Sequence, residues 1–274
     1  MTNSTLDCVF SMARTVFLYL SVLMLGSGAV GCQVTVQSKG YEIVRRFPHD
    51  TDAYTQGLVY AGGVLYESTG RLGQSQVRRV DLETGRVLEA TSLPSDRFGE
   101  GLALLDGKLY QLTWKTNVGY VYDAETLALA DSFAYEGEGW GLATDGTSLI
   151  MSDGTATLRF LDPTDFSVVR KVTIEDNGSP LRQVNELEYV DGKLYANVYY
   201  SDWIVRIDAE TGAVEEWLEF AGILPDDERP RDSDGVLNGI AYNDATGLFL
   251  VTGKLWPGLF EVRLLGREEG GAAH

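Results

Sequence analysis

One motif occurs five times along the chain: Gln56-Gly57-Leu58, Glu100-Gly101-Leu102, Trp140-Gly141-Leu142, Asn185-Glu186-Leu187 and Asn238-Gly239-Ile240. The first residues of successive copies lie 44, 40, 45 and 53 positions apart. Repetition with a period of about 40–50 residues is typical of proteins that build one small structural unit per repeat. The nature of that unit follows from the residues between the copies.

Turn signals divide each repeat into short strands. A two-residue turn follows the first four copies: Gly62-Gly63, Asp106-Gly107, Asp145-Gly146 and Asp191-Gly192. Such dipeptides between alternating apolar runs are the strongest short signal for a hairpin. Every repeat then has a second strand (VLYEST, KLYQLT, SLIMSD, KLYANV and LFLVTG), and third strands end near Asp81, Asp123, Asp162 and Asp208. Four short strands per repeat predict an all-β fold, a five-bladed β-propeller of four-stranded antiparallel blades.

The two ends of the repeat array predict how the ring closes. The last repeat runs out after its third strand, around residues 260–264, and a β-prone stretch over residues 41–46 precedes the first repeat. We expect this N-terminal strand to complete the last blade, because that arrangement removes two free sheet edges. The extra residues of the longest spacing fall within residues 221–235. They predict an inserted loop on one face, mobile unless a ligand or a neighbouring loop orders it.

Residues 1–32 have the layout of a secretory signal peptide: Arg14, an apolar run over residues 15–31, and small residues before Cys32. A membrane-spanning helix is a competing interpretation, although the run is at the short limit for a bilayer. Residues 29–32 also resemble a bacterial lipobox, which would attach a lipid to Cys32; simple cleavage is the alternative. We therefore expect an exported protein, periplasmic or secreted, with a single domain over residues 33–274. Membrane attachment is expected only through a lipid anchor at Cys32.

The composition excludes several function classes. Forty Asp and Glu residues against 22 Lys and Arg residues give a net charge of −18, which would repel nucleic acid and anionic membrane surfaces. The chain has two cysteines and two histidines, and Cys8 and His274 lie near its ends. A His/Cys metal cluster cannot be built from them, and a Ser-His-Asp triad could use only His49. We expect a monomer without a metal or other cofactor.

A propeller places the first residues of the five motif copies around one axis: Gln56, Glu100, Trp140, Asn185 and Asn238. A second set lies at the ends of the second strands: Gly70, Trp114, Gly154, Tyr199 and Gly253, with Lys254 directly after the last. Asn and Gln at strand starts often only cap neighbouring backbone, and a single Trp is usually a core residue. A purely structural ring, however, would favour small or apolar residues, which cost less to desolvate.

Glu100 favours chemistry more than any other residue of these sets. It lies between Gly99 and Gly101, and the repeat register points it at the axis beside Trp114 and Trp140. Burial would raise the pKa of its carboxyl group, which suits a general acid/base near neutral pH. The residues alone therefore predict an apolar pocket with one carboxylate, carboxamides and one lysine, and they do not name its ligand.

Seven motifs, in order, resemble the plant and bacterial type of glutaminyl-peptide cyclotransferase (glutamine cyclotransferase). They are Tyr54-Thr-Gln-Gly-Leu58, Tyr66-Glu-Ser-Thr-Gly70, Phe98-Gly-Glu-Gly-Leu102, Gly139-Trp-Gly-Leu142, Asn185-Glu-Leu-Glu-Tyr189, Val236-Leu-Asn-Gly-Ile240 and Thr252-Gly-Lys-Leu-Trp-Pro257. The resemblance runs from about Pro48 to Leu264. It implies a five-bladed propeller that converts the N-terminal glutamine of peptides or proteins into pyroglutamate, with release of ammonia.

The resemblance also implies a role for each pocket residue. The catalytic glutamate falls on Glu100, the contacts to the substrate amide fall on Gln56, Asn185 and Lys254, and the pocket aromatics fall on Phe98, Trp114 and Trp140. Lys254 and Asn185, with Gln56, would stabilise the oxyanion. Two positions depart from the pattern: Tyr54 stands where the plant form has Phe, and Tyr199 where a pocket Trp is usual. Both keep an aromatic face, and their hydroxyl groups could make new hydrogen bonds.

Two other functions agree with the same ring of residues. A calcium-dependent propeller lactonase or phosphotriesterase would also gather Glu and Asn at the axis, with Glu100, Asn185 and Asn238 as ligands. A non-catalytic propeller that binds sugars would use the tryptophans as stacking surfaces. Sensitivity to a chelator would identify the first alternative, and the absence of any turnover would identify the second.

Overall fold

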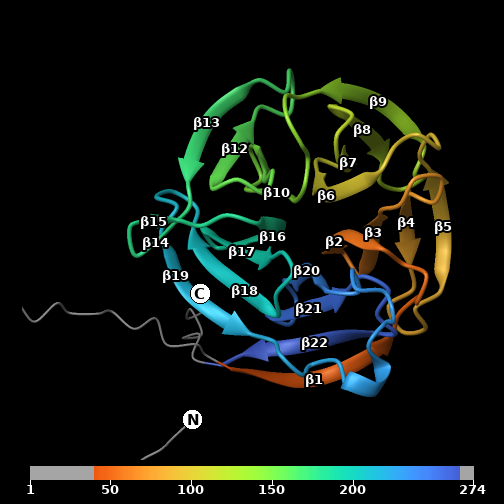
Figure 1. Ribbon diagram of the computed structural model, residues 1–274. Helices are drawn as coiled ribbons and strands as arrows, with labels where there is room; N and C mark the ends of the chain where they lie inside the picture. The colour runs from red at the N-terminus through yellow and green to blue at the C-terminus, as the bar shows by residue number, and fades with distance from the viewer. Residues whose placement is uncertain (1–39, 266–274) are drawn as a thin grey trace, which may run out of the picture. The chain divides into compact units, whose positions relative to one another are not determined.

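The computed structural model describes residues 40–265, which form β-strands and one short 3-10 turn but no α-helix. Five four-stranded antiparallel sheets stand around one axis (Figure 1), so the predicted five-bladed propeller is confirmed. Residues 1–32 lie outside the described residues, and the signal peptide and the lipid anchor at Cys32 stay predictions. No helix within residues 40–265 is long and apolar enough to cross a membrane.

The strands of a blade follow one another from the axis outward. Blade 1 contains β2 (Thr55–Ala61), β3 (Val64–Thr69), β4 (Gln76–Val80) and β5 (Val87–Ser92); blade 2 contains β6 (Gly99–Leu105), β7 (Lys108–Thr113), β8 (Val118–Asp123) and β9 (Leu129–Ala134). Blade 3 contains β10 (Leu142–Thr144), β11 (Leu149–Met151), β12 (Thr157–Leu161) and β13 (Val168–Thr173); blade 4 contains β16 (Val184–Val190), β17 (Lys193–Val198), β18 (Trp203–Asp208) and β19 (Val214–Glu219). Blade 5 contains β20 (Leu237–Asn243), β21 (Leu248–Gly253), β22 (Gly258–Leu264) and β1 (Tyr41–Pro48). A small ribbon of β14 (Glu175–Asp176) and β15 (Ser179–Pro180) precedes blade 4.

The N-terminal strand closes the ring as the sequence predicts. β1 lies along the outer edge of blade 5 (Figure 1), antiparallel to β22, with Tyr41 opposite Leu264 and Pro48 opposite Gly258. Closure buries apolar side chains from both ends of the chain together. Phe47 and Leu259 pack in one cluster with Leu58 and Leu65 of blade 1. Blades 1 and 5 are therefore joined by a shared core as well as by backbone pairing.

The hairpin turns agree with the predicted dipeptides in three of the four cases. Both residues have positive φ at Gly62-Gly63, Asp106-Gly107 and Asp191-Gly192, as a type I′ turn requires. Blade 3 differs, because Gly146 alone has positive φ there. In that loop the Asp145 carboxylate accepts a hydrogen bond from the Ser148 backbone N–H at 2.7 Å, which stabilises a wider connection.

The glycine of the repeated motif permits close approach of the innermost strands. A Cβ atom on Gly57 would lie 2.5 Å from the backbone nitrogen of Leu102 in the next blade. In the fourth copy this position holds Glu186, which is completely buried. Its carboxylate accepts hydrogen bonds from the backbone N–H groups of Leu58 at 3.2 Å and Ile240 at 2.8 Å. The exception to the glycine pattern therefore joins blade 4 to blades 1 and 5.

The insertion over residues 221–235 contains the 3-10 turn η1 (Asp226–Glu228). Contacts with other parts of the propeller hold it: Arg46 binds Glu228 with one N–O distance of 2.9 Å, Arg71 pairs with Asp232, and the Trp256 indole donates to the Gly235 carbonyl at 2.9 Å. Neighbouring elements thus order the loop, which is one of the two ways that the sequence analysis anticipated.

Candidate active site

A cavity of about 190 Å³ lies at the end of the axis where the innermost strands begin. It is lined by Tyr54, Gln56, Phe98, Glu100, Trp114, Trp140, Asn185, Tyr199, Asp234 and Lys254. Nine of these residues are the ones that the sequence analysis assigned to the site, and the structure brings all nine together. Asp234, from the insertion, is the addition.

Local irregularities in the innermost strands aim the polar residues at this cavity. The pairing register shifts between Thr55 and Gly57 in β2, between Gly99 and Leu102 in β6, between Val184 and Leu187 in β16, and between Leu237 and Ile240 in β20. A bulge of this kind takes a residue out of the ladder and redirects its side chain. Gln56, Glu100, Asn185 and Asn238 lie at these shifts. In blade 3, Trp140 stands just before β10 begins.

Glu100 is the carboxyl group at the floor of the cavity. It is 4% exposed, and burial raises its pKa well above the usual value. The Lys254 ammonium opposes this rise, and the Glu138 carboxylate adds to it. No side chain among residues 40–265 donates a hydrogen bond to the Glu100 carboxylate, which leaves both oxygens available to a ligand.

Lys254 lies beside it and is 2% exposed. Its Nζ is 4.8 Å from the centroids of both the Tyr54 and Tyr199 rings, which present their negative faces to the cation. Burial lowers the pKa of Lys254 to about 8, although the Glu100 and Asp234 carboxylates favour the charged form. The next residue, Leu255, has a left-handed φ of 63°, and its N–H donates to the Ala53 carbonyl at 2.7 Å. This turn fixes the backbone of the lysine against blade 1.

Asn238 lies beneath the cavity and sets the orientation of two carboxamides that line it. Its Nδ2 donates to the Thr55 backbone carbonyl at 3.0 Å and faces Gln56 Oε1 at 3.4 Å. Because a carbonyl can only accept, Asn238 must present Nδ2 to Thr55 and Oδ1 to Asn185. Asn185 Nδ2 then donates to Asn238 Oδ1 at 2.9 Å, and Asn185 Oδ1 is buried without a protein partner. Asn185 therefore presents its acceptor oxygen Oδ1 to the cavity, and Gln56 presents its amide nitrogen.

The aromatic walls are held by small residues and by one acidic residue. Phe98 contacts Tyr54 and Trp114 edge to face, with centroid distances of 5.9 and 5.8 Å. Trp140 packs across Gly154, where a Cβ atom would lie 2.7 Å from the indole. A residue larger than glycine at position 154, one of the five positions at the ends of the second strands, would displace this wall.

Glu138 is a residue that the sequence analysis missed. Its Oε2 accepts hydrogen bonds from the indole nitrogens of both Trp114, at 2.8 Å, and Trp140, at 2.9 Å. Lys115 lies 3.5 Å from the other oxygen. Partial burial opposes ionisation of Glu138, but the two indoles and Lys115 hold its pKa below the usual value. The Glu138 carboxylate (the indole clamp) therefore holds Trp114 and Trp140, two walls of the cavity, in place.

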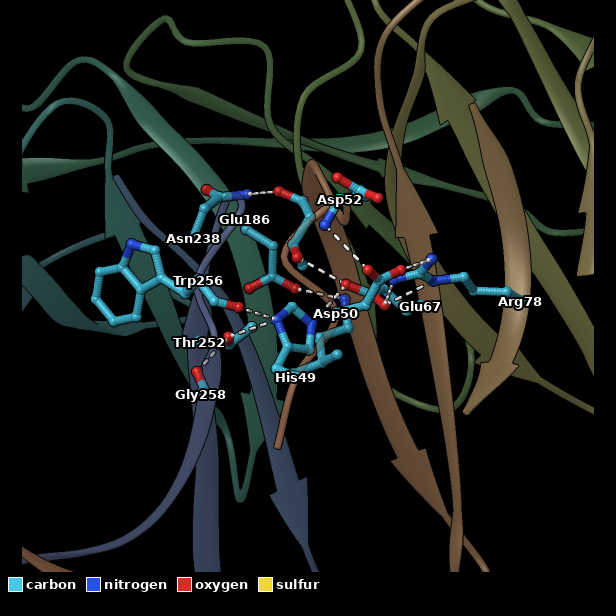
Figure 2. Close-up of polar contacts among 12 residues, drawn as sticks. His49, Asp50, Asp52, Glu67, Arg78, Glu186, Asn238, Thr252, Trp256 and Gly258 are labelled. Carbon is cyan, nitrogen blue, oxygen red and sulfur yellow. Dashed lines mark hydrogen bonds and ion pairs between the residues drawn. The ribbon is translucent and has the colours of Figure 1, made fainter. Parts of the chain in front are cut away.

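A buried ionic network supports the site from the side of blades 1 and 5 (Figure 2). His49 Nε2 faces Glu67 Oε1 at 3.0 Å, and His49 Nδ1 faces the Trp256 carbonyl at 2.8 Å. Since both ring nitrogens face acceptors, His49 is an imidazolium. Burial alone would lower the pKa of His49, but the Glu67 carboxylate raises it overall. Glu67 also accepts from Thr55, at 2.7 Å, so the network ties the start of β2 to the segment that follows Lys254.

The two tyrosines that depart from the family pattern make hydrogen bonds through their hydroxyl groups. Tyr54 bonds to Asp234, and Tyr199 bonds to Tyr200, which in turn donates to Asp234 Oδ1. New hydrogen bonds were expected at these positions, but Asp234, which Tyr54 contacts directly and Tyr199 reaches through Tyr200, was not. Burial is the main reason why the pKa values of Tyr54 and Tyr199 lie above the usual value, and the nearby Asp234 carboxylate raises both further.

The fold and the cavity define a propeller whose axial pocket places a titratable carboxyl group beside a buried lysine. The sequence model for the glutamine cyclotransferase family matches residues 17–264, and the chain belongs to that family. The glutaminyl-peptide cyclotransferase of Arabidopsis thaliana is 45% identical over 229 residues, which cover 81% of this chain and 71% of that protein. The crystal structure of Myxococcus xanthus glutaminyl cyclase is 38% identical, with a TM-score of 0.77, over 83% of this chain and 98% of that one. The resemblance found in the sequence is confirmed, and the calcium-dependent and purely binding alternatives are not favoured.

Proposed function

We propose that this chain converts the N-terminal glutaminyl residue of peptides into pyroglutamate and releases ammonia, with Glu100 as the group that moves protons. Family membership supports the reaction. The observation that carries the mechanism is a carboxyl group of raised pKa beside a buried lysine in a cavity of about 190 Å³. Ligand sites for drug-sized molecules are typically about 300–1,000 Å³. This smaller cavity suits a single residue.

The polar atoms of the cavity match the two ends of a primary amide. The side-chain carbonyl oxygen of the substrate accepts from Lys254 Nζ and from the Gln56 amide nitrogen. The NH₂ group of the substrate donates to Asn185 Oδ1, the buried acceptor that has no protein partner. In this arrangement Lys254 and Gln56 stabilise the oxyanion, and Asn185 orients the leaving nitrogen rather than donating to the oxyanion.

The chemistry is an intramolecular acyl transfer. The α-nitrogen of the substrate attacks the side-chain carbonyl carbon, a new C–N bond forms, and the proton of the amine passes to the Glu100 carboxylate. The same proton then passes from Glu100 to the amide nitrogen, the old C–N bond breaks, and ammonia leaves. Both reacting groups belong to one residue, so the enzyme gains rate chiefly by holding the folded conformer. The aromatic walls hold its aliphatic part and exclude water.

The raised pKa of Glu100 suits both proton transfers. A general base accepts best when its pKa is near the working pH, and the same group must later act as an acid. The α-amine of a peptide has a pKa of about 7.7–8.0, so its neutral form is present at mildly alkaline pH. An ordinary surface carboxylate, with a pKa of about 4.3, would be a much weaker base for this amine.

The proposal is tested with residues 33–274 and a peptide that begins with Gln. Mass spectrometry should show loss of one ammonia per peptide, at an unchanged rate in excess EDTA. An N-acetylated copy of the peptide is the matched control, because it keeps the amide and lacks the nucleophile. Absence of conversion above the spontaneous rate by folded protein would reject the reaction, and loss of activity in EDTA would restore the calcium alternative.

Replacing Glu138 with Ala should raise KM about tenfold and change kcat less. The reason is that Trp114 and Trp140 would lose their common hydrogen-bond acceptor. A hydrogen bond to a charged group contributes about 1.5–3 kcal/mol. Steady-state kinetics and tryptophan fluorescence measure the two effects. Glu138→Gln keeps one acceptor oxygen and should show a smaller change. An unaltered KM in the Ala variant would contradict the clamp.

We also propose export. The signal-like layout of residues 1–32 supports it, and cleavage before or at Cys32 would leave the propeller intact. The mass of the N-terminal peptide from protein purified out of cells distinguishes a free Cys32, a lipid-modified Cys32 and an uncleaved chain.

A further inference from the structure

The cavity has a buried floor and a more exposed mouth. Glu100, Asn185 and Lys254 are each at most 4% exposed, whereas Trp114 is 38% exposed and Tyr200, next to the cavity residue Tyr199, is 56% exposed. Asp234 lines the cavity with intermediate exposure and belongs to the inserted loop, not to a strand. Asp234 is therefore the acidic side chain at the mouth.

The position of Asp234 is fixed from several directions. Tyr200 donates to its Oδ1, and Tyr54 is a second hydrogen-bond partner. Its own backbone carbonyl accepts from Val236 N–H at 2.7 Å. The neighbouring Asp232 pairs with Arg71 of blade 1, whose guanidinium lies 4.7 Å from the Tyr54 ring centroid. A carboxylate on an otherwise exposed loop is thus held in one place.

Two ion pairs lie near the mouth, and Asp234 belongs to neither. Arg71 pairs with Asp232, and Lys115 lies 3.5 Å from Glu138. Within residues 40–265, no Lys or Arg forms an ion pair with Asp234. The Asp234 carboxylate favours the charged form of Lys254, but Lys254 lies on the floor of the cavity, where the amide of the substrate must bind. The mouth therefore presents one uncompensated negative charge.

We propose that Asp234 is the specificity residue for the second position of the peptide and favours a cationic side chain there. This inference rests on the proposed function. The cavity of about 190 Å³ holds the glutaminyl residue, so the peptide chain must leave through the mouth and place its second residue beside Asp234. A Lys or Arg at that position gains an ion pair whose acidic partner is already oriented by hydroxyl groups. A Glu or Asp at that position is repelled.

Three peptides that differ only in their second residue test the proposal: Gln-Lys-Ala, Gln-Ala-Ala and Gln-Glu-Ala, each with an amidated C-terminus. A partly exposed ion pair is expected to raise kcat/KM for the Lys peptide by up to about fivefold, and repulsion is expected to lower it for the Glu peptide. The ratio of kcat/KM for the Lys peptide to that for the Glu peptide (the Lys/Glu ratio) should therefore be about tenfold at low salt. In Asp234→Asn this ratio should fall to within about twofold of one. Asp226→Asn, which removes one charge from the same insertion at a side chain 97% exposed, is the matched control and should keep the parent ratio.

A salt titration of the parent protein gives a second measurement that needs no variant. The Lys/Glu ratio should fall toward one as the ionic strength rises from about 0.01 to 1 M, because the screening length shrinks from about 30 to 3 Å. The proposal is overturned if Asp234→Asn keeps the tenfold ratio. It is also overturned if the parent protein cyclises Gln-Ala-Ala but has equal kcat/KM values for the Lys and Glu peptides. Failure of all three peptides would instead reject cyclisation itself, so the two failures are distinguishable.

Discussion

Replacing Glu100 with Gln is expected to lower kcat about 10²- to 10⁴-fold and to change KM little. The substitution keeps the shape of the side chain and removes the group that we propose accepts and returns the proton. Since Glu100 is buried on the floor of the cavity, no neighbouring carboxylate can take its place: Glu138 is committed to two indoles, and Asp234 is held at the mouth. Single-turnover measurements with a Gln peptide separate the chemical step from binding.

The same substitution should not destabilise the protein. The pKa of Glu100 is higher in the folded chain than its usual value, so the native state binds this proton more tightly than the unfolded state does. Above a pH of about 4.3, such a group lowers the free energy of unfolding as the pH rises. Glu100→Gln removes this penalty, and its Tm at pH 8 should equal or exceed that of the parent.

A second buried glutamate provides the matched control. Glu186 also has a raised pKa, caused by burial and by Glu188, but it does not line the cavity. It accepts from two backbone N–H groups, so Glu186→Gln exchanges one acceptor oxygen for a donor and should lower Tm while most of the activity remains. If Glu100→Gln retains its kcat, or if Glu186→Gln loses activity to the same extent at an unchanged Tm, the assignment of proton transfer to Glu100 is wrong.

The repeats explain why so much of this site could be predicted from the sequence. Residues at equivalent positions of five copies must converge on a propeller axis, so register alone brought Gln56, Glu100 and Asn185 together. The closing strand followed from a similar count, since one blade lacked a strand and residues 41–46 supplied it. Family resemblance then added residues that register does not place, such as Phe98 and Tyr54.

The rest of the site depends on contacts that have no counterpart in the other repeats. Asp234 lies on an insertion present in one repeat, so no equivalent position marks it. Glu138 precedes its motif copy by two residues, and its role depends on two indole nitrogens converging on one oxygen. The orientation of Asn185 depends on the Thr55 carbonyl through Asn238, a relation across three blades that no local pattern contains. These are properties of packing, not of periodicity.

Replacing Lys254 with Met is expected to lower kcat about 10²- to 10³-fold, the usual effect of removing one donor to an oxyanion. Met has a similar length and fills the space between the Tyr54 and Tyr199 rings, so the cavity should keep its walls. Lys171, on the exposed surface of β13, gives the matched control, and Lys171→Met should leave kcat unchanged. Comparable kcat values for the Lys254 and Lys171 variants would remove Lys254 from the mechanism.

The pH profile gives a sharper test of the same residue. The pKa of Lys254 is lowered to about 8, so its ammonium form, the proposed donor to the oxyanion, is lost as the pH rises through about 8. Deprotonation of the substrate amine and of Glu100 acts in the opposite direction, because both make the nucleophile easier to form. An alkaline decline of kcat/KM can therefore come from Lys254 and not from either of these groups.

In Lys254→Arg the guanidinium stays charged, with a pKa above about 12. This variant should be less active at its optimum but should lose the decline near pH 8. A decline that persists unchanged in the Arg variant would assign the alkaline limb to another group of the enzyme.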